Sequence, residues 1–229
     1  QTTYPYFLTR RIHTTWLNAF VQSMEVFRWS FPIATYAMQS LDLSQYDIVL
    51  SSSATVAKYV IVPNGKHICY CYIPTRALWH FDEYFDNNIK AKLLKPLLPY
   101  LKRRDYSAAQ RVNRFIAISN DSREYIKKYY HRDADIIYSP IELKMFYASE
   151  KKKDHYLIVS RLEHWKRVDY AIEAFNQLGL PLKIIGTGKE GSRLRYKAKS
   201  NITFLGPVDD KTLAREYSEA LAVIFTPFL

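Results

Sequence analysis

Residues 155–188 read HYLIVS, RLEHWKR, VDYAIEAFNQL, GLP, LKII and GTG, and this order of segments decides the fold. The apolar runs His155–Ser160 and Leu182–Ile185 have the length and composition of buried strands. Between them, Val168–Leu178 carries apolar residues at helical spacing. Two strands joined through a helix pair in parallel, with the helix covering the sheet. The stretch therefore predicts a strand–helix–strand unit.

The same alternation continues on both sides of this unit. Further strands are predicted at Asp47–Ser51, His67–Ile73, Phe115–Ser119, Asp135–Tyr138, Ile202–Leu205 and Leu221–Phe225, and further helices up to Val60 and at Asn120–Tyr130, Glu190–Lys199 and Asp210–Ala220. The composition changes at 139–154, where a Ser-Pro pair is followed by a charge run. We therefore predict an α/β protein with two parallel-sheet domains, 1–149 and 150–229. The first 45 residues, rich in aromatic side chains, are expected to be helical or irregular.

The composition is that of a globular protein with an anionic partner. Of 229 residues, 48% are hydrophobic and 24% are charged, and the net charge is +11. No apolar stretch approaches the roughly 18 residues that cross a membrane. Cys69 and Cys71 alternate with Tyr70 and Tyr72 in a predicted strand and have no nearby metal-ligand partners. They predict reduced core residues, and hence a reducing, cytoplasmic compartment.

Residues 88–114 concentrate the positive charge around an apolar stripe with helical spacing. The basic residues are Lys90, Lys92, Lys95, Lys102, Arg103, Arg104, Arg111 and Arg114, against a single acid, Asp105. One interpretation is the solvated face of a helix that covers the core. A second is a patch that binds a membrane surface, because basic residues flank the apolar stripe. Nucleic acid is the weakest alternative, since no helix-turn-helix, zinc-finger or aromatic RNA-binding signature is present, and we expect no such partner.

Candidate chemistry gathers in the loops after the strands of the second domain. In open parallel sheets, ligands bind at the carboxyl ends of the strands. The loop after the first strand presents Arg161 and Lys166, the next loop is Gly186-Thr187-Gly188, and the third is Gly206-Pro207-Val208. Two cations, a Gly-x-Gly turn and helix N-termini on one sheet edge predict a diphosphate site.

These motifs, in this order, resemble family 4 glycosyltransferases, which are retaining enzymes with the GT-B fold of two Rossmann-like domains facing a cleft. The resemblance rests on SRL at 160–162, KRVD at 166–169, LKIIGTG at 182–188 and NITFLG at 201–206. In the first domain, YDIVLSSS at 46–53, HICYC at 67–71, PTR at 74–76 and RFIA at 114–117 are similar to bacterial and archaeal mannosyltransferases of O-antigen assembly. The resemblance implies transfer of a hexose, mannose from GDP-mannose, to a lipid-linked or polysaccharide acceptor.

The same resemblance implies roles for single residues. Arg161 and Lys166 match the pair that grips the donor diphosphate in place of a metal, so no metal or other cofactor is expected. Gly186 and Thr187 would line the nucleotide pocket, with Val208 near the base. The resemblance also places two first-domain features on the acceptor and sugar side: Arg76, and the Ser51–Ser53 turn with Ser52 at its centre.

Two departures from the family pattern bear on activity. Tyr72 occupies the position where relatives commonly have a histidine, and a phenol does not act as a base at neutral pH. The family's opening glycine-rich loop and its donor-binding glutamate segment are not in the sequence, so both domains are predicted to be incomplete, the first at its start and the second at its end. The alternative is therefore a non-catalytic relic that binds nucleotides or polyanions. Either protein is expected in the cytoplasm, or peripherally on the inner face of the plasma membrane.

Overall fold

The computed structural model describes residues 9–21, 23–85, 93–150 and 153–227. Two compact units divide the chain, Gln1–Ser139 and Pro140–Leu229. The predicted boundary after residue 149 falls inside the second unit. The reason is that the linker already packs on that unit: the ring of Phe146 meets the ring of Tyr217 edge-on, with 5.7 Å between centroids.

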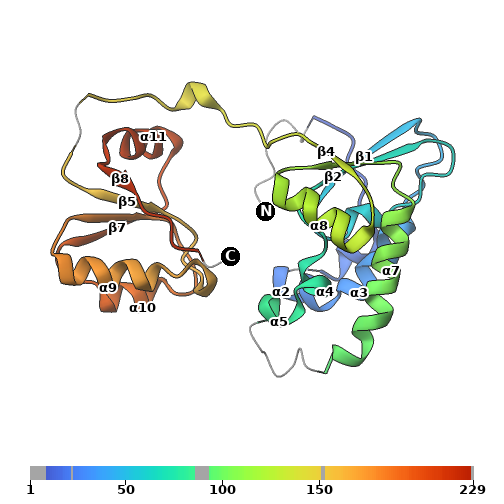
Figure 1. Cartoon of the computed structure of the whole chain (residues 1–229), viewed down its shortest axis with the longest axis horizontal. Coiled ribbons are helices and arrows are strands. Elements are labelled where there is room, and N and C mark those ends of the chain that lie inside the picture. Colours follow the sequence, from blue (N-terminus) through green and yellow to red (C-terminus); the bar gives the residue numbers. More distant parts are fainter. Residues whose placement is uncertain (1–8, 22, 86–92, 151–152, 228–229) are drawn as a thin grey trace. The chain divides into compact units, whose positions relative to one another are not determined.

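The first unit is a four-stranded parallel sheet with helices packed on it (Figure 1). Its strands run in the order β1 (Ile48–Ser53), β2 (Lys66–Cys71), β3 (Arg114–Ala117) and β4 (Ala134–Ile136). Its helices are α2 (Met24–Trp29), α3 (Phe31–Gln39), α4 (Arg76–Trp79), α5 (Phe81–Phe85), α7 (Leu98–Gln110) and α8 (Asn120–Tyr130). Short 3-10 turns are η1 (Trp16–Ala19), η2 (Ala57–Tyr59) and η3 (Lys95–Leu97).

The core of this unit lies between the sheet and these helices. Cys69 and Cys71 are buried, free thiols on the inner face of β2, as the alternation predicts. They pack with Phe115 of β3 and with Ile126 and Tyr130 of α8. Helix α8 begins where predicted, because the Ser119 hydroxyl accepts a hydrogen bond from the Ser122 amide as an N-cap.

The second unit is a four-stranded parallel sheet with helices on both faces. The strand order is β7 (Ile202–Gly206), β6 (Leu182–Ile185), β5 (Tyr156–Val159) and β8 (Ala222–Val223). In Figure 1, α9 (Val168–Leu178) and α10 (Gly191–Lys197) lie on one side of the strands, and α11 (Asp210–Glu219) lies on the other. The linker turn η4 (Leu143–Met145) and the loop turn η5 (His164–Lys166) complete this unit.

This arrangement follows from the path of the chain. From β5 the strands are added on one side through α9 and α10, and then α11 carries the chain back across β5 to β8. The strand order therefore reverses between β5 and β8. Apolar residues of β5 alternate between the two helical layers: Ile158 packs in the cluster with α9, and Leu157 packs in the cluster next to α11.

Candidate functional site

The loop after β5 occupies the carboxyl edge of the second sheet at the point where strand order reverses. Ligands of open parallel sheets bind at such a switch point. The loop contains η5. Near its start it contacts the segment after β6, and near its end it contacts the segment after β8. At its far side, the Thr226 hydroxyl, just beyond β8, donates a 2.7 Å hydrogen bond to the Lys166 carbonyl. The loop is thus held between the segments that follow β6 and β8.

Close backbone contacts join the loop after β5 to the Gly-x-Gly turn after β6. The Leu162 amide donates to the Thr187 carbonyl, and the Glu190 amide donates to the Leu162 carbonyl, each at 2.9 Å. A Cβ on Gly186 would lie 2.0 Å from the Ser160 carbonyl oxygen, and one on Gly188 would lie 2.2 Å from that of Leu162. The two glycines are therefore required because the loops touch. The resemblance implies that Gly186 lines the nucleotide pocket; in the structure its backbone packs closely against the adjacent loop.

Arg161 and Lys166 are the cations that this loop presents. Arg161 is exposed, with its guanidinium carbon 5.8 Å from the ring centroid of Trp165. Lys166 is half-buried, with its Nζ 5.9 Å from the ring centroid of Phe225. Among the described residues, no carboxylate forms an ion pair with either cation. Both charges are thus available to an anionic ligand.

The neighbouring Arg167 is engaged by its own helix. Its Nε lies 3.3 Å from the Asp169 carboxylate, and its guanidinium stacks on the Tyr170 ring at 3.8 Å. It adopts the left-handed region with φ +47°, which turns the chain sharply into α9. Arg167 therefore orients the start of α9, while Arg161 and Lys166 remain available.

One of the expected helix N-termini already holds an anion. The Asp209 carboxylate caps α11 by accepting a 2.6 Å hydrogen bond from the Thr212 amide, and this bond lowers the pKa of Asp209. Nearby Val208 is half-buried and packs against the cluster that contains Leu157 and Ile185. Thr187, by contrast, has an exposed side chain at the same sheet edge. The loops after β5 and β6 are thus the remaining candidates for an anion site at this edge.

The first unit presents a separate polar group at the carboxyl ends of β1 and β2. The hydroxyls of Ser52 and Tyr72 lie 3.0 Å apart, and both residues are exposed. The Ser122 hydroxyl donates to the Tyr72 carbonyl and ties this position to α8, a support that the sequence interpretation missed. Arg76 is exposed at the start of α4.

The prediction of a turn at Ser51–Ser53 is wrong, because these residues complete β1 by pairing with β2 as far as Cys71. Ser51 is buried, and its hydroxyl lies 2.7 Å from His67 Nε2. The Ser53 hydroxyl accepts hydrogen bonds from the Thr55 and Ala57 amides. Ser52 is therefore the one member of the triplet with an exposed side chain.

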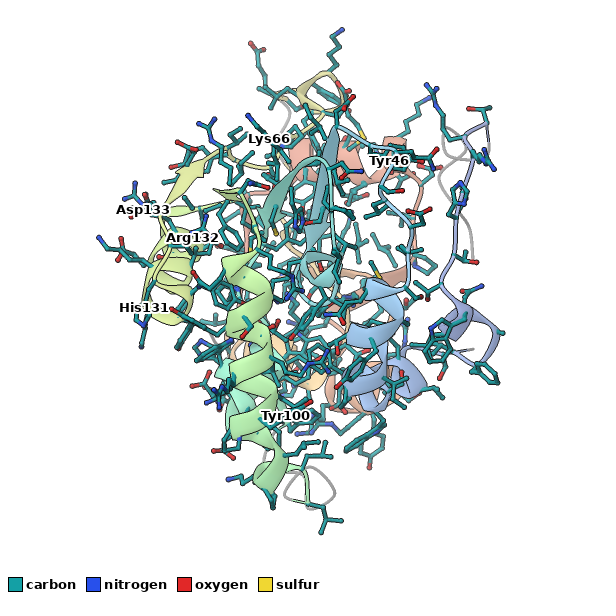
Figure 2. All side chains as sticks on the ribbon, turned by 90° about the vertical axis from the view of Figure 1, so that its right-hand side faces the viewer. Tyr46, Lys66, Tyr100, His131, Arg132 and Asp133 are labelled. Carbon is teal, nitrogen blue, oxygen red and sulfur yellow. The ribbon has the colours of Figure 1, made fainter. Side chains whose placement is uncertain are left out.

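The described part of the chain contains no group of three or more His, Cys, Asp or Glu side chains arranged to hold a metal ion. An Asp-x-Asp pattern does occur at Asp133, which directly precedes β4 (Figure 2), and at Asp135, which lies within β4. However, Asp135 is paired with Arg114 at 2.7 Å. No helix within the described residues has the length and hydropathy needed to cross a membrane.

The sequence and the fold were compared with those of known proteins. Residues 141–228 match the protein family described as "Glycosyl transferases group 1". No curated protein matches the sequence. A solved structure of TarM superposes with a TM-score of 0.56 at 14% identity, over 85% of this chain and 39% of that one. A mutant of S. aureus TarM in complex with Fondaparinux, alpha-GlcNAc-glycerol and UDP gives 0.56 at 12% identity, over 85% and 40%.

A third solved structure, AviGT4, a glycosyltransferase involved in avilamycin A biosynthesis, gives a TM-score of 0.48 at 16% identity over 82% of this chain and 47% of that one. The chain thus spans about two fifths of the TarM chain. The second unit matches the group 1 glycosyl transferases in sequence, and the chain as a whole has the two-unit α/β fold of the GT-B glycosyltransferases.

Proposed function

We propose that this chain is part of a glycosyltransferase whose donor is a sugar nucleotide held by the second unit. The observation that carries the proposal is the loop after β5, which places Arg161 and Lys166 at the switch point of the sheet with no carboxylate partner among the described residues. The family match covers this same unit. The TarM mutant, which has a similar fold, was crystallised with UDP, a nucleoside diphosphate of the kind such a loop would bind.

The chemistry of transfer assigns a role to the two cations. When the bond between the sugar and the diphosphate breaks, negative charge develops on the leaving oxygen. Fixed cations at this position stabilise that charge without an ion from solution, so we propose that activity is independent of divalent metals. The sugar, its donor base and its acceptor rest on the sequence resemblance alone: mannose from GDP-mannose, transferred with retention to a lipid-linked or glycan acceptor.

A non-catalytic nucleotide-binding relic is the second candidate, and Tyr72 is the observation that favours it. Tyr72, which directly follows β2, occupies the position where relatives commonly have a histidine, and its hydroxyl lies 3.0 Å from that of Ser52. A radiolabelled GDP-mannose transfer assay separates the two candidates. Donor binding without transfer, by a polypeptide extended at both ends of this sequence, would favour the relic.

The donor assignment is tested by calorimetric titration of the chain with GDP and with GDP-mannose. We expect Arg161→Ala and Lys166→Ala each to weaken binding by about 1.5–3 kcal/mol, or roughly 10- to 150-fold, the usual value of a hydrogen bond to a charged group. Arg193→Ala is the matched control, because Arg193 is a cation of the same unit that already pairs with Glu190. Unchanged affinity in both test variants, or an equal loss in the control, would remove the assignment.

The same titration tests the role of metals. We expect the affinity for GDP to change less than about twofold when EDTA replaces magnesium, because two side-chain cations neutralise the diphosphate. A large loss in EDTA that manganese restores would show that the cations do not replace a metal.

A further inference from the structure

A cationic pocket lies in the first unit, between α3 and α7. It has a volume of about 310 Å³ and is lined by Gln39, Tyr100, Arg103, Arg104, Ser107 and Arg111. Figure 2 shows Tyr100 near the first turn of α7, close to α3. None of these residues is Ser52, Tyr72 or Arg76. None belongs to the loop after β5 of the second unit, which is proposed to bind the donor and is called the donor loop below. The diphosphate chemistry described above therefore leaves this pocket unexplained.

The pocket side of α7 is distinct from its buried side. Arg103, Ser107 and Arg111 recur every four residues and so form one stripe along the helix. The buried stripe, which contains Leu101 and Asp105, lies on roughly the opposite side of the helix, because each of these residues is two positions, or about 200°, from Arg103. Hence the basic residues of this helix are not spread evenly over a solvated face. Arg103 and Arg104 of the helix, together with Arg111 directly after it, line one pocket.

Neighbouring aromatic side chains hold the pocket arginines in place. The guanidinium of Arg104 stacks on the Tyr36 ring at 3.6 Å, and the hydroxyls of Tyr36 and Tyr100 lie 3.0 Å apart. Arg111 donates to the Tyr59 carbonyl at 3.3 Å. Arg104 and Arg111 are therefore preorganised, and a ligand would not bear the full entropic cost of ordering them.

The charge in this pocket is not compensated among the described residues. The Nη1 atom of Arg104 is buried and has no hydrogen-bond partner there. Burial, and then the positive charge of Arg104, lower the pKa of Arg111, so the two guanidinium groups repel each other. Asp105, the one acid of α7, is buried and paired with Lys58 at 2.7 Å. A buried, unsatisfied donor beside like charges calls for an anion with several acceptor oxygens.

Exposed aromatic side chains adjoin this pocket. Tyr100 lines it, the Tyr36 ring stacks with Arg104, and each of the two tyrosines is about half exposed. Exposed aromatic rings beside arginines are typical of surfaces that lie in the headgroup region of a bilayer, whereas a site for a dissolved anion does not need them. We propose that this pocket binds the phosphate of an anionic lipid headgroup and holds the first unit at a membrane surface. This inference does not depend on glycosyl transfer or on the donor loop.

Co-sedimentation of the chain with lipid vesicles tests the proposal. Vesicles of phosphatidylcholine with about one third phosphatidylglycerol should bind the chain, and pure phosphatidylcholine should not. The double variant Arg103→Gln/Arg104→Gln should lower the partition coefficient by roughly 10- to 30-fold, since each cation at such a surface contributes about a fivefold effect. Lys102→Gln is the matched control, because Lys102 lies on the same helix over the Trp79 ring and outside the pocket; its effect should stay below about twofold.

Two further arms separate the pocket from its alternatives. Arg103→Lys keeps the charge but loses the bidentate geometry, so it should also weaken vesicle binding if a phosphate is gripped directly. Circular dichroism verifies that each variant is folded. Equal losses in Lys102→Gln and Arg103→Gln would indicate diffuse charge and overturn the proposal. Binding of inorganic phosphate to the pocket without vesicle binding would overturn the lipid as its source.

Discussion

His67 shows, at the scale of one residue, how burial makes stability depend on pH. It is 2% exposed, its Nε2 lies 2.7 Å from the Ser51 hydroxyl, and its Nδ1 has no hydrogen-bond partner among the described residues. Burial, and then the charge of Arg111, lower its pKa to about 4. The folded protein therefore holds the neutral imidazole, since no acceptor is placed to receive a second N–H.

The consequence is a loss of stability in acid. Because the unfolded chain protonates His67 near pH 6.5 and the folded chain only near pH 4, its contribution is complete above pH 6.5 and is lost as the pH falls to 4. The difference amounts to at most about 3 kcal/mol. Urea unfolding from pH 4 to 7 should show a shallower pH dependence for His67→Gln than for the unmodified chain. If the free energy of unfolding depends on pH equally in the variant and the unmodified chain, the assignment to His67 is contradicted. His155 is also buried with a lowered pKa, and it contributes the same pH dependence to both proteins.

At the scale of elements, a buried polar network around Asp105 attaches α7 to its neighbouring elements in the first unit. Asp105 accepts hydrogen bonds from the Tyr59 and Tyr130 hydroxyls at 2.7 Å and from the Trp79 indole at 2.8 Å, and it pairs with Lys58 at 2.7 Å. Burial alone would raise the pKa of Asp105, but Lys58 and these donors outweigh it and lower the pKa. The carboxylate thus connects α7 to η2, α4 and α8.

Breaking this network should be costly. Asp105→Ala leaves Lys58 buried without its partner and should lower the free energy of unfolding by about 3–5 kcal/mol. Asp135→Ala is the control, because it removes an equally short ion pair with Arg114 that is exposed and should cost less than about 1 kcal/mol. Guanidinium denaturation measures both. Similar costs for the two variants would show that the network contributes no more than a surface pair.

The elements themselves could largely be predicted from local patterns. Helix α9 and strand β6 have the predicted bounds, because apolar periodicity and length agree there. Strand β8 is shorter than predicted, Ala222–Val223, since it pairs only with β5 in the described residues. Strand β1 is longer, because pairing with β2 holds Ser52 and Ser53 extended despite their low strand propensity.

The candidate site was predictable where it depends on topology. Parallel strands bring the loops after β5 and β6 to one edge, so Arg161, Lys166 and Gly186 could be assigned to one region.

Contacts that depend on tertiary packing could not be predicted. The pairing of Lys58 with Asp105, 47 positions apart, depends on packing between helices that no local pattern encodes. For the same reason the contact of Gly188 with Leu162 could not be predicted.

At the scale of the whole molecule, the two units have separate cores and separate candidate sites. The clusters of the first unit contain no residue of the second, and the reverse also holds among the described residues. The loop after β5, the two glycines of the loop after β6 and the segment after β8 all belong to Pro140–Leu229. Binding of a nucleotide to this loop should therefore stabilise one unit and leave the other unaffected.

Calorimetric unfolding tests this division, and we expect two transitions, of which GDP raises only one. A ligand at about 100 times its dissociation constant stabilises the unit that binds it by about 2.7 kcal/mol. Asp105→Ala should lower the other transition, and in this way it identifies the two units. In Arg161→Ala, the same GDP concentration should move neither transition appreciably. If GDP raises both transitions together, or if the chain unfolds in a single transition, then the units are coupled and the donor site is not confined to the second one.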